Sequence, residues 1–144
     1  MSAEAFLRIS ADVGDLDAVR RFIREKAGLP VDQDALHAMV RAVDECVCNI
    51  IVHGYRGQPG SIQIALRQSQ GSLVVRLRDQ APPFDPTAVP SPDVTSPLEQ
   101  RPLGGLGIHL ARHLVDEMTY RQAPEGGNEL TLVKRISRPP DGEE

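Results

Sequence analysis

The sequence has few aromatic residues and no excess of basic charge. Phe, Tyr and Trp make up 3% of the 144 residues, and Trp is absent. A core must therefore be built from aliphatic side chains, and a hydrophobic content of 40% is sufficient for one domain. The formal net charge of −4 argues against a nucleic-acid partner, because binding to phosphates requires a basic face.

Cysteine and long apolar runs are also scarce. Cys46 and Cys48 are the only two cysteines, too few for a disulfide framework or a cysteine metal site, so we expect reduced thiols. No apolar run has the length of a membrane span. The first residues, MSAEAFLRIS, lack the basic and apolar regions of a secretion signal. We therefore expect a cytoplasmic protein without a membrane partner.

Apolar periodicity predicts a single domain at residues 1–136 and a disordered tail at residues 137–144. The expected elements, in chain order, are a strand at 4–11, helices at 15–27 and 33–53, strands at 61–68 and 72–79, a helix at 104–118, and strands at 119–124 and 128–136. Hairpins join most strands and the helices are separate. This order predicts an α+β fold, a two-layer sandwich with helices on one face of a mixed sheet.

One long connection interrupts this pattern. Residues 80–103 contain seven of the twelve prolines and little periodic apolar signal. A connection of this length in a compact domain is typical of a functional loop or of disorder. It ends at Gly104, Gly105 and Gly107, where the third helix begins. Backbone N–H groups at a helix N-terminus suit a phosphate, and glycines permit close approach, so the connection is expected to act as a lid.

Three polar residues interrupt the apolar segment ECVCNIIVHGY. Glu45, Asn49 and His53 lie four residues apart, and on a helix such a step advances by about 40°, so they form one slanted ridge. A solvated boundary row explains any one of them alone. Asp79, at a strand end, adds a carboxylate acceptor that suits an exocyclic amine such as that of adenine. A carboxamide and a carboxylate on the facing helix suit a hydrated divalent cation and a catalytic hydroxyl.

These blocks, ExxxN, DxxxxF, a lid and GGLG, resemble in order and spacing the GHKL nucleotide-binding superfamily, which includes gyrase and histidine kinases. Within it, DECVCNIIVHGY, FDP and GGLGIHLARHLVDEMTYR followed by NELTLVKRI are most similar to the bacterial anti-sigma factor serine kinases. The resemblance extends from about residue 5 to residue 136. It implies a Bergerat-type ATP-binding fold with a long ATP lid, and ATP and Mg²⁺ as cofactors.

The resemblance also implies catalytic and metal-binding roles. Asn49 would coordinate Mg²⁺, and Glu45 would act as general base on the attacking hydroxyl or orient it. His53 occupies a position that faces the nucleotide in relatives. Arg101 lies where these kinases carry an arginine and would stabilise the transferred charge at the γ-phosphate. A solvated lid arginine explains Arg101 equally well.

Further positions are implied for the nucleotide itself. Asp79 would accept a hydrogen bond from the adenine amine, and Phe84 would line the base pocket. Gly105, Leu106 and Gly107 would offer their backbone N–H groups to the phosphates.

Two positions depart from the superfamily pattern. The adenine-side box usually has glycine where this chain has Ala81, and the added methyl group bears on nucleotide affinity. Asn128 stands where relatives often have threonine, which makes it a weak candidate for a polar contact. His109 and His113 have the spacing of helical zinc ligands but lack the glutamate of HExxH, which favours a solvated or structural role.

Two functions remain open. The first is an ATP-dependent protein-serine kinase that acts as an anti-sigma factor or analogous partner-switching regulator. It would phosphorylate a serine of a small antagonist protein of the anti-anti-sigma type, with a sigma factor and a second copy as further partners. The alternative is a non-catalytic, nucleotide-sensing module that sequesters a sigma factor or another regulator. Ala81 and the proline-rich lid favour this alternative slightly.

Overall fold

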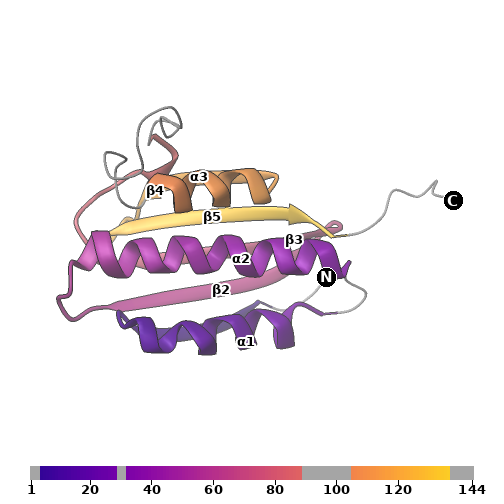
Figure 1. Ribbon diagram of the computed structural model, residues 1–144, viewed down its shortest axis with the longest axis horizontal. Coiled ribbons are helices and arrows are strands. Elements are labelled where there is room, and N and C mark those ends of the chain that lie inside the picture. The colour runs from indigo at the N-terminus through magenta and orange to yellow at the C-terminus, as the bar shows by residue number, and fades with distance from the viewer. Residues whose placement is uncertain (1–3, 29–31, 89–104, 137–144) are drawn as a thin grey trace, which may run out of the picture.

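The computed structural model describes residues 4–28, 32–88 and 105–136. Figure 1 shows the helices lying across one face of a single sheet. The elements are β1 (Ala5–Ser10), η1 (Val13–Asp15), α1 (Leu16–Lys26), α2 (Gln33–Asn49), η2 (Ile50–Tyr55), β2 (Ser61–Ser69), β3 (Ser72–Asp79), η3 (Pro86–Ala88), α3 (Gly105–Leu114), β4 (Glu117–Gln122) and β5 (Asn128–Arg135). Within the described ranges, none of the helices combines the length and apolarity that crossing a bilayer requires.

The sheet has five strands in the order β1-β2-β3-β5-β4. The expected α+β two-layer sandwich is confirmed, but the expectation of a mixed sheet is wrong, because all four strand pairings are antiparallel. The reason is the last hairpin. Strand β5 returns between β3 and β4, so two strands that run in the same direction are separated by one that runs opposite to both.

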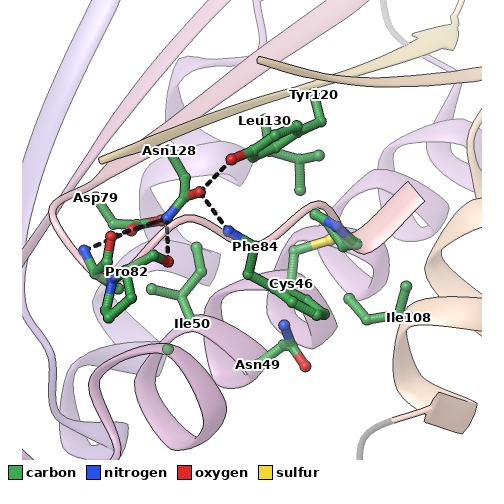
Figure 2. Close-up of a pocket in the computed structure, with 13 residues that line it drawn as sticks. Cys46, Asn49, Ile50, Asp79, Pro82, Phe84, Ile108, Tyr120, Asn128 and Leu130 are labelled. Atoms are coloured by element: carbon green, nitrogen blue, oxygen red, sulfur yellow. Dashed lines mark hydrogen bonds between the residues drawn. The ribbon is translucent and has the colours of Figure 1, made fainter. Parts of the chain in front are cut away.

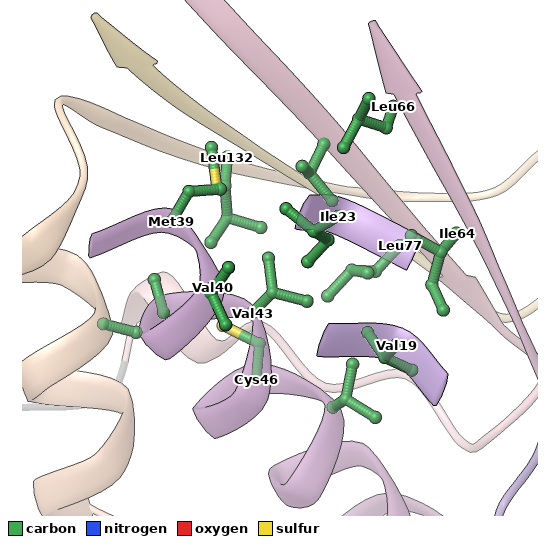
Figure 3. Close-up of a cluster of buried hydrophobic side chains, with 14 of the residues drawn as sticks. Val19, Ile23, Met39, Val40, Val43, Cys46, Ile64, Leu66, Leu77 and Leu132 are labelled. Atoms are coloured by element: carbon green, nitrogen blue, oxygen red, sulfur yellow. The ribbon is translucent and has the colours of Figure 1, made fainter. Parts of the chain in front are cut away.

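The core lies between the helical layer and the inner face of the sheet. Val19 and Ile23 of α1 and Met39 and Val43 of α2 are almost fully buried against the strands (Figure 3). On β3 the alternation of a half-buried strand places Leu73, Val75 and Leu77 in this core. The same alternation carries the last residue of β3, Asp79, into the interior.

The opposite face of the sheet carries a polar row. Arg8, Gln63, Arg78, Glu129 and Arg121 are cross-strand partners on five successive strands. The Glu129 side chain is only 7% exposed and accepts from Arg121 at 2.7 Å and from Arg78 at 3.4 Å. A buried carboxylate in an open sheet face is thus neutralised by the arginines beside it.

Two helix ends differ from the sequence expectation. The helix expected to run to His53 is α-helical only to Asn49, and Ile50–Tyr55 forms a π-helical turn. The turn ends at Arg56 in the left-handed conformation, with φ of 54°, and at Gly57, with φ of 81°. The third helix ends at Leu114, and β4 already begins at Glu117, because the Asp116 N–H binds the Val133 carbonyl at 2.8 Å.

Candidate functional site

A small cavity lies where the end of α2, the end of β3, α3 and the β4–β5 hairpin meet (Figure 2). Its volume is about 30 Å³, room for water but not for a purine ring. The polar lining comes from Asn49, Asp79, Tyr120 and Asn128, on four different elements. The sheet and the second helix thus bring together residues that lie far apart in the sequence.

Asp79 is the buried acid of this cavity, with 4% exposure. Its Oδ1 accepts from the Ala81 N–H and from the Asn128 Nδ2, both at 2.9 Å. Burial raises the pKa of Asp79, and these two hydrogen bonds oppose the rise. No hydrogen bond reaches Oδ2 within the described residues, and Asp79 lines the cavity, so this oxygen is available to accept from a further donor.

Asn128 is the most connected side chain of the site. It is the direct cross-strand partner of Asp79. Its Nδ2 also approaches the carbonyls of Ala81 and Pro82 at 3.2 Å each, and its Oδ1 accepts from the Phe84 N–H at 2.9 Å. From the sequence alone, Asn128 was only a weak candidate for a polar contact in the site. The strand register identifies Asn128, since a residue directly opposite an acid on the neighbouring strand lies on the same face of the sheet as that acid.

Tyr55 and Tyr120 were not anticipated from the sequence. The Tyr55 hydroxyl accepts from the Gln80 N–H and donates to the Ser61 carbonyl, each at 2.7 Å, and burial raises the pKa of Tyr55. It therefore holds the residue that follows Asp79. The Tyr120 hydroxyl donates to Asn128 Oδ1 at 2.6 Å. Tyr55 closes the π-helical turn and Tyr120 lies in the mostly polar strand β4, and neither was singled out as a site residue from the sequence.

Glu45 lies beside the first turn of α3 rather than in the cavity lining. A Cβ added to Gly107 would lie 2.5 Å from Glu45 Oε1, so a side chain there would displace the carboxylate from its present position. The other oxygen, Oε2, accepts from Arg41 at 3.3 Å, and the side chain is 26% exposed. A carboxylate at a helix N-terminus is favourably placed in the helix dipole field. The structure thus joins the predicted acid to the predicted glycine turn.

The remaining predicted residues fall into three places. Asn49 lies on the opposite side of the cavity from Asn128 (Figure 2). Gly105 and Leu106 begin α3 together with Gly107, so their backbone N–H groups belong to its first turn. Arg101 and Gly104 lie outside the described residues.

A larger hollow of about 1080 Å³ adjoins the cavity, and His53 lines this hollow and not the cavity. The expected ridge through Glu45, Asn49 and His53 assumed α-helical geometry throughout. The π-helical turn after Asn49 widens the helix and breaks that spacing. Phe84, which is 46% exposed, lines both spaces, as do Gly54, Ala81 and Pro82.

Ala81, the departure from the usual glycine, is accommodated without backbone strain. Among the described non-glycine residues, only Arg56 and Gln70 have positive φ, so Ala81 adopts an ordinary conformation. Its side chain is 3% exposed and faces Gly54, where an added Cβ would lie 3.2 Å from the Ala81 Cβ. The methyl group of Ala81 thus occupies room that Gly54 leaves open.

Within the described residues, no group of three or more His, Cys, Asp or Glu side chains is arranged to hold a metal ion. His109 and His113 contact each other, with ring centroids 4.3 Å apart. His113 Nδ1 lies 2.9 Å from the His109 carbonyl, an interaction within their own helix.

Comparison with known proteins gives consistent matches. Residues 9–134 match the family described as the histidine kinase-like ATPase domain. A serine/threonine-protein kinase, BtrW, of Bordetella bronchiseptica is 34% identical over 91 residues, which cover 62% of this chain and 63% of that protein. A serine-protein kinase, RsbW, of Bacillus cereus is 28% identical over 109 residues, which cover 73% of this chain and 67% of that protein.

The family match spans nearly all of the described fold, from the end of β1 to the end of β5. The match to BtrW spans less than two thirds of the length of that kinase. The resemblance found in the sequence motifs is confirmed at the level of the family. The chain belongs to the histidine kinase-like ATPase domain family.

Proposed function

We propose that this protein is an ATP-dependent protein-serine kinase of the partner-switching type, acting in the cytoplasm on a small antagonist protein of the anti-anti-sigma type. The observation that carries the proposal is one arrangement. A buried acid with a free oxygen, an asparagine and a glycine-led helix with a carboxylate beside it surround one cavity. The names of the two kinase relatives support the same reaction class.

The adenine base is proposed to bind at Asp79. Oδ2 would accept from the exocyclic amine, while Oδ1 is occupied by Asn128 and by the Ala81 N–H. The cavity of about 30 Å³ must enlarge to admit the base. Phe84 lines both the cavity and the hollow of about 1080 Å³, and we propose that a swing of this exposed ring joins the two spaces. Phe84 would then line the base pocket as expected from the sequence.

The phosphates are proposed to lie at the start of α3. The first-turn N–H groups of Gly105, Leu106 and Gly107 have no partner inside the helix and point along its axis. Mg²⁺ fits Asn49 as its protein ligand, because Mg²⁺ commonly keeps several waters and is held by one or two side chains together with phosphates. Bound there, the ion would neutralise charge on the phosphates.

Glu45 is proposed as the general base. Its carboxylate lies against Gly107, at the helix turn that would hold the phosphates, and would take the proton of the attacking serine hydroxyl. Arg101, on the lid, is proposed to stabilise the transferred charge. His53 would contribute from the adjoining hollow. A sigma factor and a second copy of this chain are proposed as further partners.

Transfer of labelled phosphate from ATP and Mg²⁺ to the antagonist protein tests this proposal. Glu45→Gln is expected to reduce transfer by about 100-fold or more while nucleotide binding persists, since general-base catalysis contributes about 10²–10⁴. Glu25→Gln, on the exposed face of α1, is the matched control and should transfer normally. Undiminished transfer by Glu45→Gln overturns the catalytic assignment.

The alternative is a non-catalytic, nucleotide-sensing module that sequesters a regulator. The narrow cavity and the methyl group of Ala81 favour it. Calorimetry with ATP and Mg²⁺ separates the two functions early. If no ATP binding is detected, the kinase proposal is wrong. If ATP binds but no phosphate is transferred to any antagonist, the result supports the alternative.

A further inference from the structure

Asn128 makes hydrogen bonds to both the acid of the cavity and the chain that follows it. We infer that Asn128 is a positioning residue, and this inference rests on the proposed nucleotide site. Asn128 holds Asp79 as an acceptor for an amine-bearing base, and it also fixes the start of the lid. The side chain is 7% exposed, so its hydrogen bonds are shielded from water.

The orientation of the Asn128 amide follows from its partners. Three acceptors surround Nδ2: Asp79 Oδ1 and the carbonyls of Ala81 and Pro82. Two donors reach Oδ1: the Phe84 N–H and the Tyr120 hydroxyl (Figure 2). The reverse orientation would turn the NH₂ group toward the Phe84 N–H and the Tyr120 hydroxyl, and the amide oxygen toward the carbonyls of Ala81 and Pro82. Only the orientation described above therefore gives each group a suitable partner.

This orientation determines what Asp79 offers to the cavity. A donor at 2.9 Å from Oδ1, together with the Ala81 N–H, favours a carboxylate there. Oδ2 then presents lone pairs to the cavity. A base with an exocyclic amine satisfies such an acceptor, whereas a base with a carbonyl at the same position places two acceptors together.

The same amide fixes the backbone that leaves β3. It binds the carbonyls of Ala81 and Pro82 and the N–H of Phe84, so three of the four residues at 81–84, the lid root, have a common anchor. A side chain with a single hydroxyl could not reach this number of partners at once. Phe84, which lines both the cavity and the larger hollow, is therefore positioned by the residue that also orients Asp79.

Asn128→Asp is the sharpest variant because it keeps the shape of the side chain. Two carboxyl groups about 2.9 Å apart do not both ionise near neutral pH, so the pair shares one proton and Asp79 is an ionised acceptor for only part of the time. Calorimetry with ATP and with inosine triphosphate, which has a carbonyl in place of the amine, measures the selectivity. We expect the preference for ATP to fall about tenfold, and to become pH-dependent because the two carboxyl groups share a proton.

Gln122→Glu is the matched control, because it adds the same charge at the exposed cross-strand partner of Asn128. It should keep the selectivity of the native chain. Unchanged selectivity in Asn128→Asp, or equal affinity of the native chain for both nucleotides, overturns the inference. If the native chain binds neither nucleotide, the proposed function is wrong. The role of Asn128 in fixing the lid root is then tested by a second measurement that does not depend on nucleotide binding.

That measurement is amide hydrogen exchange, which needs no ligand. In Asn128→Ala the Phe84 N–H loses its acceptor, so its exchange should accelerate by tenfold or more, while amides of β2 remain protected. Tyr120→Phe removes only the other donor to Oδ1 and should leave the Phe84 amide protected. Equal exchange at Phe84 in Asn128→Ala and the native chain shows that the asparagine does not fix the lid root. Should Asn128→Ala fail to fold, Asn128→Leu, which has a similar size and also lacks an acceptor, provides the same comparison.

Discussion

Replacing Gly54 by alanine tests whether Gly54 and Ala81 are matched in size. The added methyl group would lie 3.2 Å from the Ala81 Cβ and 3.8 Å from Ile50 Cγ2. Ala81 cannot retreat freely, because its N–H donates to Asp79 and its carbonyl accepts from Asn128. We therefore expect the strain to pass to Asp79 and to the cavity.

Two opposing effects set the magnitude. Overpacking a filled site costs about 1–3 kcal/mol, and a contact that needs only a few tenths of an ångström of movement belongs at the low end. Gly→Ala in a helical turn contributes about 0.5–1 kcal/mol in favour of folding. Gly54→Ala should therefore leave the free energy of unfolding nearly unchanged. Nucleotide affinity has no such offset and should fall about fivefold to tenfold, or about 1–1.4 kcal/mol.

The assay is a double-mutant cycle. ATP affinity by calorimetry and unfolding in urea are measured for Gly54→Ala, Ala81→Gly and the double variant. The double variant should regain most of the affinity, with a coupling free energy of about 1 kcal/mol. Gly14→Ala is the control, since its added Cβ would meet nothing closer than 3.4 Å. Additive effects, with no rescue in the double variant, would refute the reasoning.

Three further predictions concern buried polar groups. Glu129→Gln should lower the free energy of unfolding in urea by about 1–3 kcal/mol, since it leaves arginines beside a neutral group, whereas exposed Glu125→Gln should change it little. Burial raises the pKa of Cys46 to about 12, so with Ellman's reagent near pH 8 it should react only after unfolding, and rapid labelling of both Cys46 and Cys48 in the native state contradicts this. Because the pKa of Asp79 is raised in the folded state, its carboxylate binds a proton more readily there than in the unfolded chain, where the pKa of Asp is 3.8. Stability should therefore fall as pH rises from 3.8 through the raised pKa, while ATP affinity rises over that range, and an affinity independent of pH would contradict the role of Asp79.

Local rules predicted most of the elements correctly. The alternation in SLVVRLRD predicted the strand, and in the structure the same alternation explains why Asp79 points inward. Asp32 precedes the second helix as a typical N-cap residue, and its Oδ1 accepts from the Asp34 N–H at 2.9 Å. These features depend on residues a few positions apart, which is the range over which sequence patterns are informative.

Features that depend on distant pairings were missed. The antiparallel sheet follows from the insertion of β5 between β3 and β4, which strand periodicity does not specify. Asn128 gains its importance from the register that sets it opposite Asp79. The contact between Glu45 and Gly107 required the packing of α2 against α3, although glycines at a helix start suggested a close approach.

The π-helical turn between Asn49 and Arg56 limits how motifs can be transferred to this chain. Counting residues from Asn49 identifies an equivalent position in a relative only if that relative has the same wide turn. Removing one residue from Ile50–Tyr55 would restore ordinary helical winding and rotate every later side chain by about 100°. The Tyr55 hydroxyl would then no longer accept from the Gln80 N–H. The length of this segment therefore helps to determine the geometry of the site proposed for the base.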